Sequence, residues 1–193
     1  MPQRDNPIDQ SLQSYGKAGR AIMEAMEAVL TRISVRKYRP DPVPEDTIRK
    51  ILQAAMSAPS AGNEQPWHFV VVDDRGILDD IPRFHEYAGM LRGAPAAIVV
   101  CADVLLKKYV NDWWIQDCSA ATQNALIAAH ALGLGAVWLG VYPVEKRVAG
   151  LRRLLGLPEN VTPLSIISVG FPAAERSPAA KRYAPSRIHR NKW

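Results

Sequence analysis

The sequence predicts one domain in which a single β-sheet is flanked by helices, of the α/β or α+β class. Short β-branched runs alternate along the chain with segments whose apolar residues recur at helical spacing. No hairpin signal such as Asn-Gly joins one predicted strand to the next. The chain has 193 residues, of which 48% are hydrophobic, which is enough for one substantial core and hardly enough for two.

The chain begins with residues 1–17, which are polar and lack periodicity, so we expect a flexible leader followed by a single domain over 18–193. A first helix is predicted over 18–32. Its apolar residues share one face: Ile22, Met23, Met26, Val29, Leu30 and Ile33. Three prolines in 39–44 predict a stiff turn into a second helix. The buried stripe of that helix is predicted to be Ile48, Ile51, Leu52, Ala55 and Met56.

The rest of the chain alternates strands and helices. The predicted strands are 68–73, 96–102, 136–141 and 165–170. Residues 76–93 predict one or two short helices interrupted by Pro82. A helix over 117–132 is rich in alanine, so another backbone can approach it closely, and we expect it to be central and buried. A last helix over 143–155 is expected to end at Gly156.

The net charge of +5 at neutral pH has a local origin. The C-terminal tail contains five basic residues and no acid: Lys181, Arg182, Arg187, Arg190 and Lys192. Without them, 24 − 5 = 19 basic residues balance 19 acidic ones, so the body is neutral and is not a nucleic-acid-binding surface. The tail itself can be a solvated arm, an anion-binding element or a nucleic-acid arm.

Targeting signals are missing from the sequence. No apolar run approaches the roughly 20 residues of a transmembrane helix, and the N-terminus lacks the apolar region of a secretory signal. We therefore expect a cytoplasmic protein with no membrane partner. The two cysteines, Cys101 and Cys118, are too few for a disulfide framework and are expected to be buried small hydrophobes.

Several catalytic motifs are also missing. There is no metal-ligand spacing, P-loop or nucleophile elbow, so neither a metal nor a catalytic side chain is predicted. The glycines at 133 and 135 follow a helix and precede a strand, the reverse of a dinucleotide fingerprint. The histidines are expected to be structural or solvated, the second and third of them on helices: His68, His85, His130 and His189.

Three segments could bind a ligand. Residues 32–37 combine guanidinium groups with a hydroxyl, which suits a phosphate monoester, although a basic helix end is the plainer alternative. The loop 58–68 presents hydroxyl and amide groups between two prolines, which suits a planar heterocycle unless the loop is an ordinary connection. Gly140 ends a strand, where backbone N–H groups can approach a ligand unless this is a simple strand terminus.

The order of these segments and their residue motifs together resemble those of the nitroreductase-like FMN flavoproteins. The resemblance runs from about residue 28 to the C-terminus and leaves only the leader outside. Its most specific element is the pattern Pro-Ser-x-x-Asn-x-Gln-Pro-Trp over 59–67. The matching stretches are 32–40, 42–44, 58–69, 94–100, 116–124, 133–140, 155–158 and 168–172.

The resemblance implies an α+β fold: a three-layer α/β/α sandwich with a mostly antiparallel central sheet, in a domain-swapped homodimer with two FMN sites at the interface. One subunit would bind the phosphate, the ribityl chain and the pyrimidine edge through Arg32, Ile33, Ser34 and Arg36. Leu139 and Gly140 would offer backbone N–H groups near flavin N5. Many relatives carry an acid where Leu139 stands, so only the backbone role carries over.

The second subunit would contribute the loop residues Pro59, Ser60, Ala61, Gly62, Asn63 and Gln65. The C-terminal arm would embrace the partner, with Arg182 and Arg187 completing the phosphate site. This role favours anion binding by the tail over nucleic-acid binding.

The implied activity is that of an FMN-dependent NAD(P)H oxidoreductase. FMN would be bound tightly and non-covalently, Arg36 would stabilise charge at N1, and small aromatic or quinone acceptors would be reduced by ping-pong hydride transfer. Residues 73–114 would supply a lid and an acceptor pocket with aromatic side chains: Phe84, Tyr87, Trp113 and Trp114. The alternatives are a specialised flavin enzyme of the same fold (dehalogenase, oxidase or flavin-degrading) and a non-catalytic FMN-binding protein.

Overall fold

The computed structural model describes residues 23–106, 108–174 and 182–193. Its centre is a four-stranded sheet with the order β1-β2-β4-β3, in which every neighbouring pair is antiparallel. The strands are β1 (Trp67–Val72), β2 (Ala96–Asp103), β3 (Gly135–Gly140) and β4 (Val161–Gly170). The four predicted strands and the α+β class are confirmed. The last strand begins earlier than expected because its first residues pair with the end of β2.

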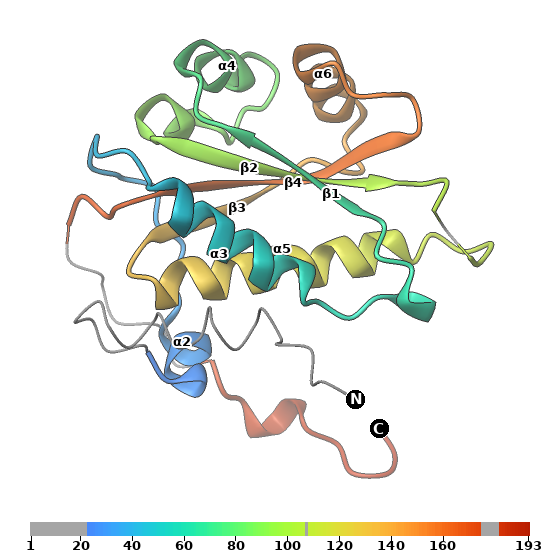
Figure 1. The fold of residues 1–193 in the computed structure, drawn as a ribbon. Helices are drawn as coiled ribbons and strands as arrows, with labels where there is room; N and C mark the ends of the chain where they lie inside the picture. The colour runs from blue at the N-terminus through green and yellow to red at the C-terminus, as the bar shows by residue number, and fades with distance from the viewer. Residues whose placement is uncertain (1–22, 107, 175–181) are drawn as a thin grey trace, which may run out of the picture.

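Helices cover both faces of the sheet, as Figure 1 shows. α3 (Glu45–Met56) and α5 (Trp114–Ala131) lie on one face, and α4 (Arg75–Asp80) and α6 (Glu145–Leu155) lie on the other. Alternate residues of β2 therefore enter different cores: Ile98 and Val100 pack towards α3 and α5, and Val99 packs on the opposite side. This gives the expected three-layer arrangement. None of the helices in the described part of the chain combines the length and apolarity that crossing a bilayer needs.

The alanine-rich helix α5 is central, as predicted. Ala121, Ala125 and Ala129 are fully buried against the sheet and α3. Asn124 Nδ2 donates to the carbonyl of Ala54 on α3 at 3.1 Å, which ties the two helices together. Cys118 on α5 is buried, as is Cys101 on β2, so the expectation for both cysteines is confirmed.

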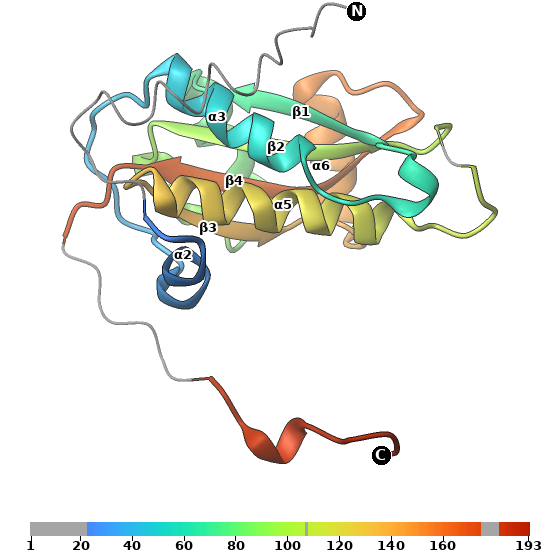
Figure 2. The same cartoon turned by 60° about the horizontal axis from the view of Figure 1, so that its bottom comes forward.

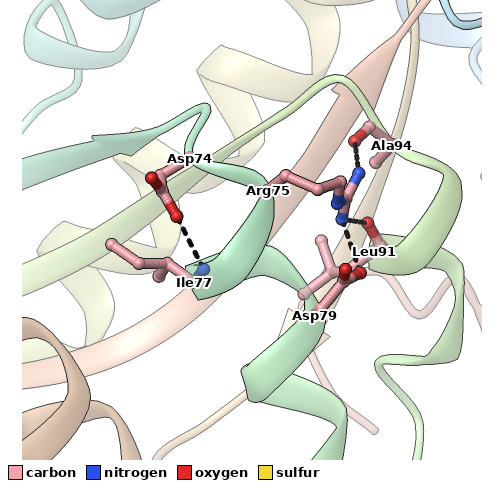
Figure 3. Close-up of polar contacts among 6 residues, drawn as sticks. All are labelled: Asp74, Arg75, Ile77, Asp79, Leu91 and Ala94. Atoms are coloured by element: carbon pink, nitrogen blue, oxygen red, sulfur yellow. Dashed lines mark hydrogen bonds and ion pairs between the residues drawn. The ribbon is translucent and has the colours of Figure 1, made fainter.

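Short helices form the layer around α4. After α4 follow the 3-10 helices η2 (Ile81–Arg83) and η3 (Gly89–Gly93). Asp74 caps α4 by accepting the Ile77 N–H at 2.9 Å. Arg75 connects α4 to the end of η3: it donates to the carbonyls of Leu91 and Ala94 and pairs with Asp79 at 3.1 Å (Figure 3). The expected short helices are therefore present.

The N-terminal helix differs from its prediction. Helix α2 spans Ala25–Thr31, and the leader and residues 18–22 lie outside the described residues. Among the described residues its apolar face does not form part of the core, because Met26 and Leu30 are 68% and 66% exposed and only Ala28 is buried. Helical periodicity identifies an apolar face but does not say what covers it.

Two smaller expectations are corrected. Met56 is half exposed rather than part of the buried stripe of α3, because it lies in the last turn. His85 lies between η2 and η3 and not on a helix. The predicted end of the last helix is confirmed: Gly156 follows α6 with φ of 63°, a left-handed conformation that glycine adopts without strain.

Candidate functional site

The outer edge of β3 positions the site. The segment that follows α2 runs alongside this edge: Ser34 and Ala136 form a parallel bridge, and the Val35 N–H donates to the Ala136 carbonyl at 3.0 Å. Because the direction of backbone groups alternates along a strand, Trp138 and Gly140 also direct theirs to this edge, away from β4. The N–H of Gly140 is therefore open to a ligand at this edge.

Close packing holds the segment 32–38 against the sheet. A Cβ on Gly135 would lie 2.6 Å from the side chain of Val35, so only glycine permits this approach. Tyr38 anchors the end of the segment by donating its hydroxyl to the Val35 carbonyl at 2.6 Å and to the Ser168 carbonyl at 3.2 Å. Burial raises the pKa of Tyr38 to about 12, so the phenol stays a donor.

A cavity of about 480 Å³ lies at the open end of β3. It brings together Arg36, Leu139 and Gly140, three residues that the sequence predicted for one site. Five further lining residues were not predicted for the FMN site: His85, Tyr87, Met90, Trp138 and Arg147. They come from the segment after η2, from η3, from β3 and from α6, and no local sequence signal connects these four parts of the chain.

Two side chains hold the carbonyl of Gly140. His85 Nε2 donates to it at 2.9 Å and Arg147 Nη1 donates at 2.8 Å. Burial, with the positive charge of Arg147 as the second cause, lowers the pKa of His85, so the ring is neutral and carries its proton on Nε2. Arg147 also pairs with Glu86 at 2.6 Å, and this hydrogen bond lowers the pKa of Glu86.

Two arginines from distant parts of the chain lie near each other. The pKa of Arg32 is lowered, first by burial and second by the positive charge of Arg182 in the C-terminal segment. Such a pair of like charges is unfavourable alone and is stabilised by an anion. Ser34 is exposed on the same stretch as Arg32. Arg187, on the 3-10 helix η4 (Pro185–Arg187), is exposed and does not line the cavity.

The loop between α3 and β1 has a defined internal structure. The Ala61 N–H donates to Asp117 Oδ1 at 3.0 Å, and the Gln65 N–H donates to Ser60 Oγ at 3.0 Å. Gln65 Nε2 donates to Asn63 Oδ1 at 3.0 Å, so both amides are oriented. Gly62 has φ of 53°, and a Cβ there would lie 2.8 Å from the hydroxyl of Tyr109. These contacts therefore hold the loop in a defined conformation.

The loop and the cavity belong to opposite edges of the sheet. β1 and β3 are the two outer strands, and neighbouring strands lie about 4.8 Å apart, so roughly 14 Å separates them. The ladders connect Gly140 through β4 and β2 to Phe69, which places the loop and the cavity at the same end of the sheet. Within one chain the two predicted sets of ligand-binding residues do not meet.

Apolar surface is exposed on α2 and on the C-terminal segment. Tyr183 and Trp193 are 81% and 101% exposed, and the apolar face of α2 is also open. Figure 2 shows that the segment 182–193 runs away from the sheet and its helices. Apolar side chains of both segments are therefore exposed in the part of the chain that the structure describes.

The four aromatic residues expected in an acceptor pocket do not gather at one place. Tyr87 lines the cavity beside Gly140. Phe84 lines a different depression, against Gly150 of α6. Trp114 is a core residue in edge-to-face contact with Tyr142, with ring centroids 4.9 Å apart. Trp113 begins the turn into α5 and is partly exposed.

The chain belongs to the nitroreductase family: residues 29–88 and 79–171 match the model of the Nitroreductase family. It is 53% identical over 171 residues to a Methanothermobacter thermautotrophicus protein with the provisional name NADH dehydrogenase/NAD(P)H nitroreductase, covering 89% of this chain and 88% of that protein. A Parabacteroides distasonis crystal structure with the same provisional name is 42% identical, with a TM-score of 0.83 and coverage of 88% of this chain and 98% of that one.

One similar structure contains the cofactor that the sequence suggested. A protein of Desulfovibrio desulfuricans, provisionally named a nitroreductase, was solved in complex with FMN. It is 31% identical, its TM-score is 0.76, and the match covers 90% of this chain and 99% of that one.

Proposed function

We propose that this chain is an FMN-dependent NAD(P)H oxidoreductase whose FMN lies between two copies of the chain. The observation that carries the proposal is the division of the site between opposite edges of one sheet. The β3 edge presents Arg36 and the backbone of Gly140, and the loop before β1 presents Asn63 and Gln65. A second copy that places its loop against the β3 edge completes the site.

The residues at the β3 edge fit a phosphorylated flavin. Arg32 and Arg182 are like charges that a phosphate would stabilise, with the Ser34 hydroxyl as a further donor. Arg187, on the same terminal segment, would complete this phosphate site. Arg36 places a guanidinium in the cavity, where it suits the pyrimidine edge of the flavin.

Bound FMN supplies the hydride-transfer chemistry, with NAD(P)H as the electron donor. Arg36 stabilises negative charge where it develops, and the Gly140 N–H is a fixed donor in the same cavity. Tyr87, Met90 and Trp138 give the cavity apolar and aromatic walls, which suit flat acceptors such as nitroaromatics and quinones. Donor and acceptor use this cavity in turn, which gives ping-pong kinetics.

The homodimer has its own physical support. The apolar face of α2 and the apolar residues of the terminal segment need a cover, and a second copy of the chain supplies it. The terminal segment, which runs away from its own sheet (Figure 2), is the arm that embraces the partner in a domain-swapped arrangement.

An absorbance spectrum before and after anaerobic NADH and NADPH tests the activity. Bands near about 370 and 450 nm that bleach on reduction are expected of a flavin reductase. Bands that do not bleach would indicate an FMN-binding protein without this activity, or a specialised flavin enzyme with another reductant. A colourless protein that cannot be reconstituted with FMN would overturn the proposal.

Mixed dimers test where the site lies. Arg36→Ala disables the β3 half of each site and Asn63→Ala disables the loop half, so each homodimer should be inactive. A heterodimer of the two contains one fully intact site, so random mixing should recover about a quarter of the wild-type activity.

The matched control mixes Arg36→Ala with Arg32→Ala. These substitutions lie in the same half-site, so both sites of that heterodimer remain defective and no recovery is expected. No recovery in the first mixture would place the site within a single chain. Equal recovery in both mixtures would contradict the assignment of Arg32 and Arg36 to the same half-site.

A further inference from the structure

The peptide unit between Gly140 and Val141 is held at both of its polar groups. Its carbonyl accepts hydrogen bonds from His85 Nε2 at 2.9 Å and from Arg147 Nη1 at 2.8 Å. Its N–H, that of Val141, donates to the Leu164 carbonyl at 3.0 Å. The two side-chain donors come from different segments, one after η2 and one on α6, so only the folded chain brings them to this carbonyl.

Arg147 is itself held on several sides. Its side chain is only 12% exposed, Nη2 contacts Glu86 Oε1 at 2.6 Å, and the guanidinium lies over the ring of Tyr87 at 5.4 Å from the centroid. A largely buried guanidinium is stable only with such partners. Since Glu86 and Tyr87 follow His85 directly, this short stretch and Arg147 form one connected unit around the Gly140 carbonyl.

The orientation of the β3 backbone determines which polar groups of Gly140 face the cavity. The N–H and C=O of Gly140 both face the open edge of β3. The backbone groups of Ala136, four residues earlier on the same strand, face this edge as well. The carbonyl oxygen carries partial negative charge, which would oppose any ligand group that gains electrons there. A charge-assisted hydrogen bond from Arg147 offsets that charge and leaves the N–H as the group offered to a ligand.

We propose that Arg147 and His85 are positioning residues that fix the Gly140 backbone and so direct its N–H, rather than its carbonyl, towards the redox-active ring of bound FMN. Neither residue is among those that the family resemblance assigns to FMN. The inference rests on the proposed function, because it requires FMN in the cavity beside Gly140.

The test compares Arg147→Gln, Arg147→Lys and His85→Asn with wild type and with Arg153→Gln, a control on an exposed part of the same helix. Three quantities are measured: the FMN dissociation constant, the midpoint potential of the bound flavin and the anaerobic rate of its reduction by NADH. Amide exchange at Val141 is followed in the protein without FMN, where no activity is involved.

We expect Arg147→Gln to slow flavin reduction by about ten- to a hundred-fold and to lower the midpoint potential. The FMN dissociation constant should change by less than about threefold, because phosphate binding is untouched. Amide exchange at Val141 should accelerate in Arg147→Gln and in His85→Asn. Arg147→Lys keeps the charge and one donor, so it should recover part of the rate, and Arg153→Gln should match wild type.

Two outcomes in folded variants overturn the inference. Unchanged rate, potential and amide exchange in a folded Arg147→Gln protein would show that the hydrogen bonds to Gly140 are dispensable. An equal loss in Arg153→Gln would show a general effect of helix charge. If Arg147→Gln does not fold, the comparison of Arg147→Lys and His85→Asn with wild type decides. A wild-type protein that binds no FMN would instead refute the proposed function, and this inference with it.

Discussion

The Asp117 carboxyl at the start of α5 is a buried acid that lacks a full set of partners. Its Oδ1 accepts the Ala61 N–H at 3.0 Å, but its Oδ2 is buried without a hydrogen bond among the described residues, as is Oε2 of Glu64. Burial is the main cause that raises the pKa of Asp117; Glu64 adds to it, and the Ala61 N–H opposes it. Asp117→Asn keeps the acceptor, removes the charge and replaces the unpaired oxygen with a donor.

The size of the expected change in stability follows from the buried polar atoms that lack a hydrogen bond. An unsatisfied buried polar group costs about 1–3 kcal/mol, and Asp117→Asn removes one such oxygen together with its unfavourable interaction with the charge of Glu64. We therefore expect Asp117→Asn to raise the free energy of unfolding by about 1–2 kcal/mol at neutral pH. For a chain of this size, the melting temperature should rise by about 2–8 °C.

The pH dependence of the free energy of unfolding gives a second, independent check on the role of Asp117. Since the folded state binds the Asp117 proton more tightly than the unfolded state does, its contribution to stability is fully present below the unfolded pKa and is lost as pH rises through the raised folded pKa. The stability gap between Asp117→Asn and wild type should therefore be small in acid and widen as pH rises.

Urea unfolding at fixed protein concentration, from about pH 4 to pH 8, measures this gap. Asp73→Asn, at an exposed acid just after β1, is the control and should show no such widening. A less stable Asp117→Asn protein at neutral pH, or a gap that stays constant, would refute the reasoning.

Three further perturbations test packing and charge. Gly150→Ala places a Cβ 2.4 Å from the ring of Phe84, so the free energy of unfolding measured in urea should fall by about 1–3 kcal/mol. An unchanged free energy of unfolding would mean that the ring moves freely. Asp74→Ala removes the cap of α4, so the free energy of unfolding measured by thermal unfolding should fall by about 1 kcal/mol. Asp74→Asn keeps a capping oxygen and should retain most of the stability, and equal losses in the two variants would contradict capping. Arg182→Gln should raise the FMN dissociation constant about three- to tenfold in calorimetry and reduce its salt dependence; an unchanged constant would separate Arg182 from the phosphate site.

Local patterns predicted most of the secondary structure because they reflect the environment of each segment. Ala121, Ala125 and Ala129 of α5 are buried as their spacing indicated, and so are the β-branched residues of β2. The apolar stripe of α2 was recognised equally well, yet it faces outward in this chain. Periodicity reports that a face avoids water and carries no information on whether the same chain or another one covers it.

The site was predicted only where its residues lie in short runs. Arg36 and Gly140 were each visible in a local segment, and the fold brings them to one cavity. His85 and Arg147 could not be found this way, because their role is a hydrogen bond to a backbone carbonyl, and any residue type carries such a carbonyl.

The sequence by itself determined the class of fold, the family resemblance and the residue types available for an anionic, planar ligand. Only the tertiary structure decided which of them share a cavity and which lie on opposite edges of the sheet. The physical reason is the pairing order: β1 and β3 are far apart in space because β2 and β4 lie between them, and that order depends on contacts between segments distant in the chain. The separation of the loop before β1 from Gly140 therefore became visible only once the sheet was assembled.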